Sequence, residues 1–238
     1  RNQPESSAVS FTGVLPPVMR GPKRVANSPI IMPKRGTIDD QREDLILAMY
    51  QNHPLEDYVR DGVGLRRQIS KELREDMQRA DRGAPQAKGF AREAERIGRL
   101  MREQRQYRIA FIELGGWDTH AGQGNAQGNL ANQLHGLGEG LRILADSLGQ
   151  SWSNTVVAVI SEFGRTFREN GSKGTDHGHG STIWVLGGGI AGGKIIGEQA
   201  RLRPEDLHED RDVPVLNEYR GVLGGICHEL FAMNEEDR

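Results

Sequence analysis

The sequence is short of cysteine, of excess charge and of long apolar runs, and each shortage excludes a class of protein. The single cysteine, Cys227, excludes an internal disulfide, and its place in an apolar helical pattern indicates a core residue rather than a nucleophile. Lysine and arginine total 31, aspartate and glutamate total 33, and the net charge is only −2. This balance gives no electrostatic reason to expect a nucleic-acid or anionic-membrane partner.

No apolar run approaches the roughly 18–20 residues that a membrane-spanning helix needs, so we expect no membrane span. Residues 1–7 lack the charged and then apolar pattern of a signal peptide, and they lack an initiator methionine. We therefore expect a processed product or a fragment. One cysteine suits a reducing compartment, but it equally suits an exported protein that avoids thiols, so the compartment stays open.

Composition divides the chain into three segments. Residues 1–36 are rich in proline and predict a loop-rich lead-in, with one short strand near residues 10–14. Residues 37–106 are rich in arginine, glutamate, glutamine and alanine, which is typical of exposed helices, so we expect a helical insert outside the catalytic layer. Thr37 is suited to cap the first helix. The helices are expected over residues 37–52, 55–80 and 85–104.

Residues 107–238 have the pattern of an α/β domain. Leucines at intervals of three and four predict an amphipathic helix over residues 130–148, and a last helix is expected over residues 216–233. Alternating strands and helices predict a mostly parallel sheet flanked by helices, with its ligand site at the carboxyl ends of the strands. Short apolar runs predict the buried strands over residues 108–114, 155–160 and 182–186.

Residues that can bind a metal ion lie at the predicted ligand-binding edge of the sheet, where the carboxyl ends of the strands meet. We expect three carboxylates and three imidazoles at one edge of the sheet. This mixture of oxygen and nitrogen ligands favours Zn, Mn or Fe over Mg or Ca, for which histidine is a poor ligand. The residues are Asp118 and His120 after the first strand, Glu162 after the second, and Asp176, His177 and His179 before the third.

Each of these elements alone also has a structural interpretation. The Asp-x-His pair can be a hydrogen-bonded loop, and Glu162 at a strand end can accept hydrogen bonds from nearby donors. Three such elements at consecutive strands favour the metal site. The remaining histidines are interpreted as surface or core residues: His53, His135, His208 and His228.

Arg165 is the candidate anion clamp, because its planar guanidinium can pair with two oxygens of a phosphate or sulfate. The alternative is a salt bridge that holds its loop to Glu162 or Asp176. His177 or His179 is the candidate general acid.

Ordered motifs carry a resemblance to a known family. They resemble the domain-of-unknown-function 1501 family, which is grouped with the alkaline-phosphatase-like superfamily of two-metal phosphatases, sulfatases and phosphoglycerate mutases. The resemblance implies an alkaline-phosphatase-like fold and a small anionic ester as substrate. The motifs are Gly-Gly-Trp-Asp-Thr-His at residues 115–120, Ser-Glu-Phe-Gly-Arg-Thr at 161–166, Gly-Thr-Asp-His-Gly-His-Gly-Ser at 174–181, Leu-Gly-Gly-Gly-Ile-Ala-Gly-Gly at 186–193 and Arg-Asp-Val-Pro-Val at 211–215.

Carried over to this chain, the resemblance implies that Asp118 and His120 form one metal pair, with His177 or His179 as the final histidine ligand. It covers residues 107–232, with a looser match before them.

Two positions depart from the superfamily's pattern. Glu162 replaces the aspartate of an Asp-His-Gly strand end, and Phe163 stands where a histidine ligand is expected. Phe163 therefore weakens the expected second metal site, unless Asp176 or the other loop histidine compensates.

A larger departure lies upstream. In the superfamily the first metal-binding aspartate and the nucleophile come from an N-terminal half, and residues 1–106 show no strand followed by such a pair. The resemblance therefore implies an incomplete fold: a truncated or split member, or one that needs a partner chain for the missing half. It also implies an exported or periplasmic protein. No persuasive nucleophile is visible, because no base lies at catalytic spacing from Thr166, Ser172 or Ser181.

Two functions follow as alternatives. The first is a metal-dependent hydrolase of phosphate or sulfate esters, with Zn or Mn as the favoured ion and metal-assisted displacement as the mechanism. The second is a non-catalytic metal-binding accessory or interaction module. The ligand cluster favours the enzyme, and the missing nucleophile favours the module.

Overall fold

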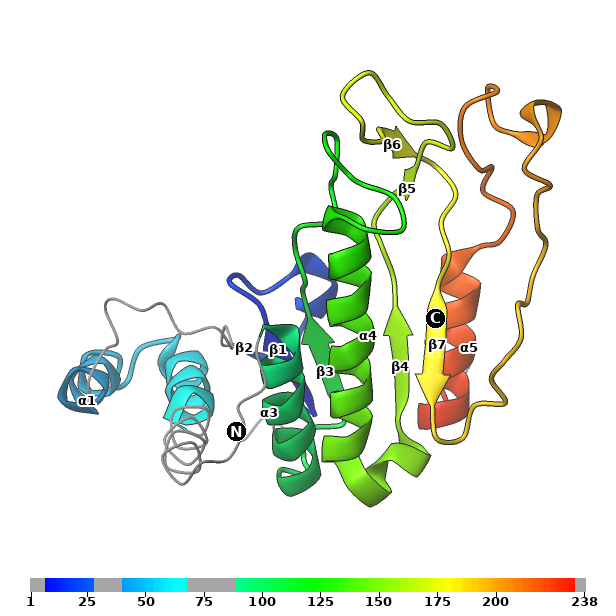
Figure 1. The fold of residues 1–238 in the computed structure, drawn as a ribbon. Coiled ribbons are helices and arrows are strands. Elements are labelled where there is room, and N and C mark those ends of the chain that lie inside the picture. The colour runs from blue at the N-terminus through cyan, green and yellow to red at the C-terminus, as the bar shows by residue number, and fades with distance from the viewer. Residues whose placement is uncertain (1–6, 28–39, 68–88, 234–238) are drawn as a thin grey trace, which may run out of the picture. The chain divides into compact units, whose positions relative to one another are not determined.

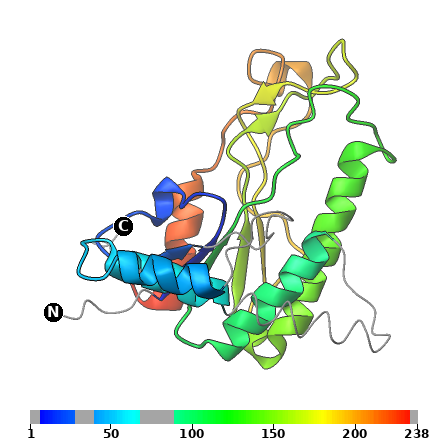
Figure 2. The same ribbon diagram turned by 90° about the vertical axis from the view of Figure 1, so that its left-hand side faces the viewer.

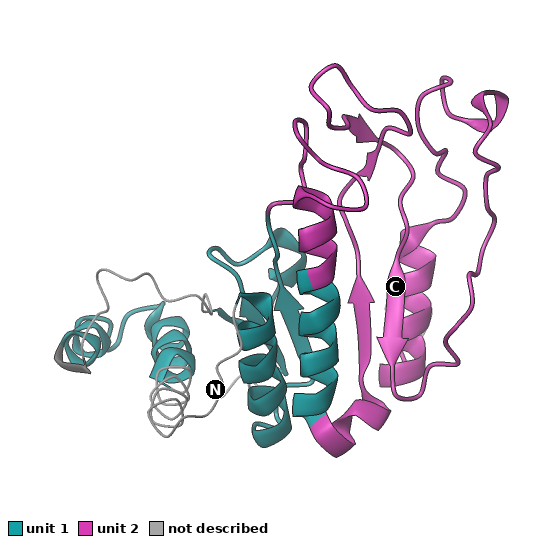
Figure 3. Ribbon diagram, in the orientation of Figure 1, with its two compact units in different colours: residues 1–115, 136–148 teal, residues 116–135, 149–238 magenta. Residues whose placement is uncertain are grey.

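A computed structural model describes residues 7–27, 40–67 and 89–233 of the chain. The fold is mixed α/β and forms two compact units (Figure 3): unit 1, residues 1–115 and 136–148, and unit 2, residues 116–135 and 149–238. The boundaries predicted after residues 36 and 106 do not coincide with this division.

Unit 1 contains a small parallel sheet of three strands in the order β2-β1-β3 (Figure 1). Two of its strands overlap the predictions for residues 10–14 and 108–114. Val9 and Ser10 on the middle strand are fully buried, so the predicted lead-in supplies the centre of this sheet. The elements are β1 (Ala8–Phe11), the short helix η1 (Pro17–Met19), β2 (Ala26–Asn27) and β3 (Ile109–Ile112).

Helices α3 (Phe90–Glu103) and α4 (Asn129–Leu148) approach each other closely within unit 1. A Cβ atom on Gly98 of α3 would lie 2.6 Å from Cβ of Ser147 on α4, so glycine permits the contact. The prediction that α3 is an exposed helix is wrong. The many arginines and glutamates of α3 indicated a polar helix, but they are interleaved with small and apolar residues spaced three apart. These residues form one buried face of the helix: Ala91, Ala94, Ile97 and Leu100.

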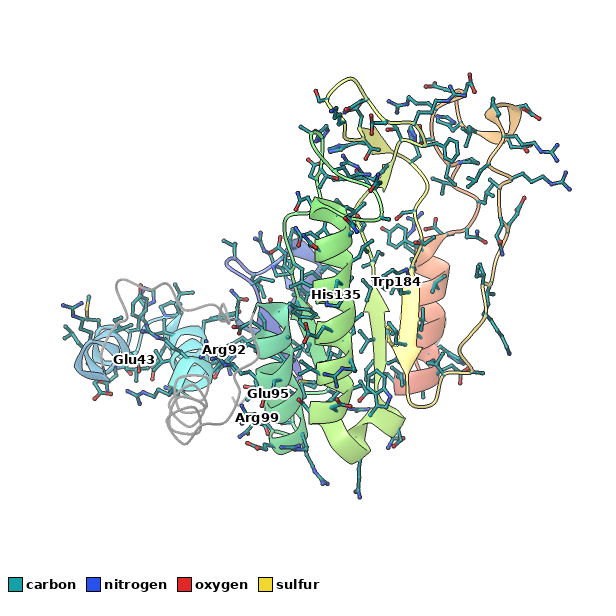
Figure 4. All side chains as sticks on the ribbon, in the orientation of Figure 1. Glu43, Arg92, Glu95, Arg99, His135 and Trp184 are labelled. Atoms are coloured by element: carbon teal, nitrogen blue, oxygen red, sulfur yellow. The ribbon has the colours of Figure 1, made fainter. Side chains whose placement is uncertain are left out.

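A buried carboxylate joins α1 (Asp40–Met49) to a further helix over residues 56–67. Glu43, labelled in Figure 4, is 4% exposed, and its two oxygens lie 3.1 Å from Nε of Arg66 and 3.0 Å from Nε of Arg67. Guanidinium partners on both oxygens compensate for the cost of burying the charge. The predicted cap Thr37 and residues 68–80 of the predicted second helix lie outside the described residues.

Unit 2 contains an antiparallel strand pair, β4 (Val156–Val159) and β7 (Trp184–Gly187). Both strands were predicted, but they pair antiparallel and lie outside the parallel sheet, whereas the sequence indicated one mostly parallel sheet. Parallel neighbours need a crossover connection, usually a helix. The chain between these strands, all of it described, contains no such helix. It forms a short antiparallel ribbon, with two residues in each strand, and so reverses direction. The end of β4 and the start of β7 therefore lie at the same end of the pair. The ribbon consists of β5 (Gly164–Arg165) and β6 (His177–Gly178).

The C-terminal helix α5 (Tyr219–Phe231) agrees with its prediction and lies beside β7 (Figures 1 and 2). Short helices η2 (Gly149–Asn154) and η3 (Pro204–Asp206) complete unit 2. Among its described residues, Leu207 is the one apolar side chain that is buried, and β4 is only half-buried along its length. No helix within the described ranges has both the length and the apolar character to cross a membrane.

Candidate metal centre

Two loops of unit 2, residues 117–123 and 170–176, lie against each other and carry the candidate site. They are joined by backbone hydrogen bonds, so residues far apart in the sequence are held at a fixed spacing. The bonds run from Gly122 N to Ser172 O at 3.0 Å, from Gln123 N to Lys173 O at 2.8 Å and from Thr175 N to Thr119 O at 3.1 Å.

Asn170 and Gly174 set how closely the two loops approach. The side-chain amide of Asn170 donates to the carbonyl of His120 at 3.0 Å, and its oxygen accepts from the backbone N–H of Gly174 at 3.0 Å. A Cβ atom on Gly174 would lie 2.3 Å from the carbonyl carbon of His120, so a larger residue would push the loops apart. The backbone contact therefore requires glycine at this position.

The ribbon of β5 and β6 places Arg165 opposite His177. The ring of Phe163, just before the ribbon, stacks on the ring of His177, with centroids 3.9 Å apart and planes 18° from parallel. Phe163 stands where the resemblance implied a histidine ligand. In this structure it covers one face of His177 and limits the rotation of that ring.

Asp118, His120 and His177 converge on one oxygen atom. Oδ1 of Asp118 lies 3.0 Å from Nδ1 of His120 and 3.0 Å from Nε2 of His177. One donor atom from each residue lies within 4.8 Å of the other two, and all three side chains are about half-exposed. Solvent and ions therefore have access to the group.

This donor set fits a divalent transition-metal ion. Zn binds imidazole nitrogen and carboxylate oxygen at about 2.0–2.2 Å with tetrahedral geometry, which separates neighbouring donors by about 3.3–3.6 Å. The two oxygen–nitrogen distances of 3.0 Å are slightly shorter, and half-exposed side chains have room to turn outward. Three protein ligands leave a fourth position for water or substrate.

The surroundings of Asp118 lower the pKa of its carboxyl group. Desolvation is the largest single effect and opposes ionisation, but hydrogen bonds from Arg165 and His177 and the charges of His120 and His177 together outweigh it. Asp118 is therefore a carboxylate at neutral pH, which is the form that binds a cation.

Arg165 is held on two sides. Its NH1 group donates to Oδ1 of Asp118, its Nε donates to the hydroxyl of Thr175 at 3.0 Å, and its NH2 group donates to the carbonyl of Thr175. The salt bridge considered as an alternative to the anion clamp thus exists, but its partner is Asp118 rather than Glu162 or Asp176. The anion-clamp role of Arg165 stays a prediction.

Three predicted metal ligands lie outside the group formed by Asp118, His120 and His177. Glu162 is exposed in the loop after β4. Asp176 is also exposed and accepts a hydrogen bond of 2.9 Å from the side chain of Asn170. His179 binds Asp212. The assignment of Glu162, Asp176 and His179 as metal ligands stays a prediction.

His179 and Asp212 form a second polar group. Nδ1 of His179 lies 2.9 Å from Oδ2 of Asp212, and the backbone N–H of His179 donates to the same oxygen at 2.6 Å. Asp212 is fully buried, and its Oδ1 accepts from Nε of Arg211 at 3.2 Å. The ring of His208 meets the ring of His179 edge to face at 4.4 Å.

The pKa of Asp212 is lowered even though the residue is buried. Desolvation is again the largest single effect and raises the pKa, but the hydrogen bonds and charge of His179, together with the charge of Arg211, outweigh it. Sequence reasoning missed Asp212 and placed His208 among the structural histidines. The only available signal was the Arg-Asp pair at residues 211–212, within a motif of the family resemblance.

The match to a protein family covers most of the chain. The family model described as "Protein of unknown function (DUF1501)" matches residues 28–238. The chain belongs to this family. The DUF1501 match begins well before residue 107, where the motifs alone placed the start of the resemblance. No curated protein and no solved structure matches this DUF1501 chain.

Proposed function

We propose that this DUF1501 chain takes part in metal-dependent hydrolysis of phosphate or sulfate esters. The observation that carries the proposal is the convergence of Asp118, His120 and His177 on one oxygen, with Arg165 bound to the same atom. An anionic ester needs a cation at its reacting oxygen and a donor for its outer oxygens. The resemblance of the motifs to the alkaline-phosphatase-like superfamily supports the same reaction class.

In this proposal Asp118, His120 and His177 hold one divalent ion, and their donor atoms favour Zn or Mn. This set is called the metal group below. When bound, such an ion polarises an ester oxygen and neutralises the charge that develops during displacement. Arg165 donates hydrogen bonds to the outer oxygens of the substrate. A small anionic ester is therefore the expected substrate class.

His179 is better suited than His177 to move a proton. Nε2 of His177 points at Asp118 and is one of the proposed metal ligands, whereas His179 is hydrogen-bonded through Nδ1 to Asp212. A buried carboxylate in this position orients the imidazole and fixes its tautomer, with the proton on Nδ1. Nε2 of His179 is then the atom that exchanges a proton with substrate or water.

Titration calorimetry of the 238-residue chain with Zn²⁺ and Mn²⁺ tests the metal group. Asp118→Asn, His120→Ala and His177→Ala are each expected to weaken binding by about 100-fold or more, since even partners of metal ligands contribute about 10–100-fold. The matched control is His135→Ala, an exposed histidine on α4 in the same unit (Figure 4), which should leave the affinity unchanged. Equal affinities in all four variants would exclude the metal group.

Turnover needs its own assay, with aryl phosphate and aryl sulfate esters in the presence of either ion. Hydrolysis that Asp118→Ala and His177→Ala abolish would support the enzyme. Tight metal binding without hydrolysis of either ester class would support the second candidate, a metal-binding accessory or interaction module.

Exposed apolar side chains in unit 2 favour that second candidate. Ile195 and Ile196 are 83% and 84% exposed, and Ile160 after β4 is 47% exposed. Ile195 and Ile196 are consecutive, and two neighbouring isoleucines exposed to this degree offer an apolar contact for a partner chain. A module of this kind binds metal for stability alone, so turnover of either ester would exclude it.

A further inference from the structure

Arg165 already binds Oδ1 of Asp118, the carboxylate oxygen that a metal ion would need as a ligand. Its NH1 group donates to Oδ1 of Asp118, which also faces Nδ1 of His120 and Nε2 of His177 at 3.0 Å each. A carboxylate oxygen has about two lone-pair sites, so three nitrogen atoms already exceed them. When His120 and His177 bind a divalent ion, their nitrogens turn from Oδ1 to the ion, so Arg165 is the neighbour of Oδ1 that competes with it. The ion repels the guanidinium because both are cations.

The opposite edge of the guanidinium is anchored. Nε and NH2 of Arg165 bind the hydroxyl and the carbonyl of Thr175, which is buried. The Thr175 hydroxyl donates in turn to Oε1 of Gln123 at 2.7 Å, and the hydroxyl of buried Thr119 donates to the same oxygen at 2.7 Å. Arg165 therefore stays in place through one edge, while its NH1 group and the second N–H of NH2 are able to change partners.

We propose that Arg165 couples metal binding to anion binding. In the metal-free chain, NH1 neutralises Asp118. With a divalent ion on Asp118, NH1 turns away and the outer edge of Arg165 presents two N–H groups to an oxyanion. The inference rests on the proposed function, because it uses the same metal ligands. By linkage, the ion raises the affinity for the oxyanion, and the oxyanion raises the affinity for the ion by the same factor.

A purely structural role for Arg165 predicts the opposite effect on metal binding. If Arg165 only ties the loop of Asp118 to β5, its removal loosens Asp118 and weakens metal binding. If Arg165 competes with the ion, its removal frees Oδ1 and strengthens metal binding. The sign of the change in affinity separates the two roles.

The first measurement is the Zn²⁺ affinity of Arg165→Gln in the full chain at pH 7. Because the ion no longer has to break a charge-assisted hydrogen bond, binding is expected to tighten about tenfold. The matched control is Arg168→Gln, which removes the same charge three positions away. Arg168 pairs with Asp210 at 3.6 Å and is 58% exposed, so a change below about threefold is expected there.

The second measurement is the binding of inorganic phosphate to the metal-free and the Zn-loaded chain. The wild-type chain is expected to bind phosphate at least about tenfold more tightly when loaded. In Arg165→Gln this ratio should fall severalfold, because only the ion still attracts the phosphate. Inorganic sulfate, used in parallel, shows whether the coupling extends to the second ester class.

The outcomes separate the two proposals. Tighter Zn²⁺ binding and weaker phosphate coupling in Arg165→Gln support the competition. Unchanged or weaker Zn²⁺ binding in a folded Arg165→Gln chain overturns it and leaves the metal group standing. Absence of Zn²⁺ binding in the wild type overturns both. If Arg165→Gln does not fold, Arg165→Lys keeps the charge but cannot bridge Thr175 and Asp118 at once, and unchanged phosphate coupling in that variant overturns the inference.

Discussion

Removing the charge of Asp212 should destabilise unit 2 by a measurable amount that depends on pH. Its buried carboxylate accepts hydrogen bonds from the backbone and the ring of His179 and from Nε of Arg211. Asp212→Asn preserves the shape of the side chain but turns one acceptor oxygen into an NH2 group. Because the side chain of Arg211 is 48% exposed, it can turn to water, and the remaining oxygen can keep both His179 donors.

The expected loss is about 2 kcal/mol for Asp212→Asn. A hydrogen bond to a charged group contributes about 1.5–3 kcal/mol and a neutral one about 0.5–1.5 kcal/mol, so neutralising the acceptor costs about 1 kcal/mol for each of the two bonds that remain. Asp212→Ala removes the acceptor of both His179 donors, and a loss of about 1–3 kcal/mol is expected for each donor that is left buried and unpaired. Arg211→Gln, the control that removes one outer donor, should cost less than about 1 kcal/mol.

Urea unfolding followed by tryptophan fluorescence measures these losses in unit 2 alone. The three tryptophans of the chain, Trp117, Trp152 and Trp184, all belong to unit 2. Their emission therefore does not mix the unfolding of the two units, which would otherwise break the two-state assumption. The slope of the transition should match that of the wild type, since the surface exposed on unfolding does not change.

The pH dependence follows from the lowered pKa of Asp212. A lowered pKa means that the stabilisation is fully present above the ordinary aspartate value of 3.8 and is lost as the pH falls through the lower folded value. The difference between wild type and Asp212→Asn should therefore shrink below about pH 4. A difference below about 0.5 kcal/mol at pH 7, the range of ordinary surface substitutions, would refute the argument from buried charge. So would a difference that stays constant down to pH 2.

Further substitutions test the loops, the helix pair and a helix cap. Gly174→Ala should weaken Zn²⁺ binding about tenfold in calorimetry, because overpacking separates the loops, whereas Gly171→Ala has open space and should not. Gly98→Ala should lower the free energy of unfolding seen by circular dichroism by about 1–3 kcal/mol, while Gly138→Ala, exposed on α4, should raise it by about 0.5–1 kcal/mol. The carboxyl of Glu218, the N-cap of α5, should show a pKa of about 2 by carbon NMR, because Arg220 donates to it. Its cap is then kept at pH 4 and lost toward pH 2, and a measured pKa above 4 would contradict the cap contact.

Local patterns predicted the elements of this fold better than their pairing. Leucine spacing predicted α4 to within one residue of its start, and a run of β-branched residues predicted β4. The direction of β7 is set by its neighbour in space, and no period in the sequence reports it. β2 and the ribbon β5–β6 have two residues per strand, which is too short for any periodic signal.

The candidate site was predictable only as far as its motifs follow or precede strands. Asp118, His120 and His177 were found because each lies in such a motif. Asp176 precedes His177 directly, and neighbouring residues of an extended chain point to opposite sides, so only one of them faces Asp118. Asp212 lies 33 positions after its partner His179 in an irregular segment, where neither spacing nor composition marks a contact.

The backbone bonds between residues 117–123 and 170–176 close a long loop of chain that contains α4 and β4. An ion held by Asp118 and His177 would join two residues that lie 59 positions apart in the sequence, at the point where the two ends of that loop meet. It would act as a reversible cross-link in unit 2, in a chain whose one cysteine cannot form an internal disulfide. Its strength would depend on the concentration of free metal around the protein, because an ion that binds only the folded state stabilises by mass action.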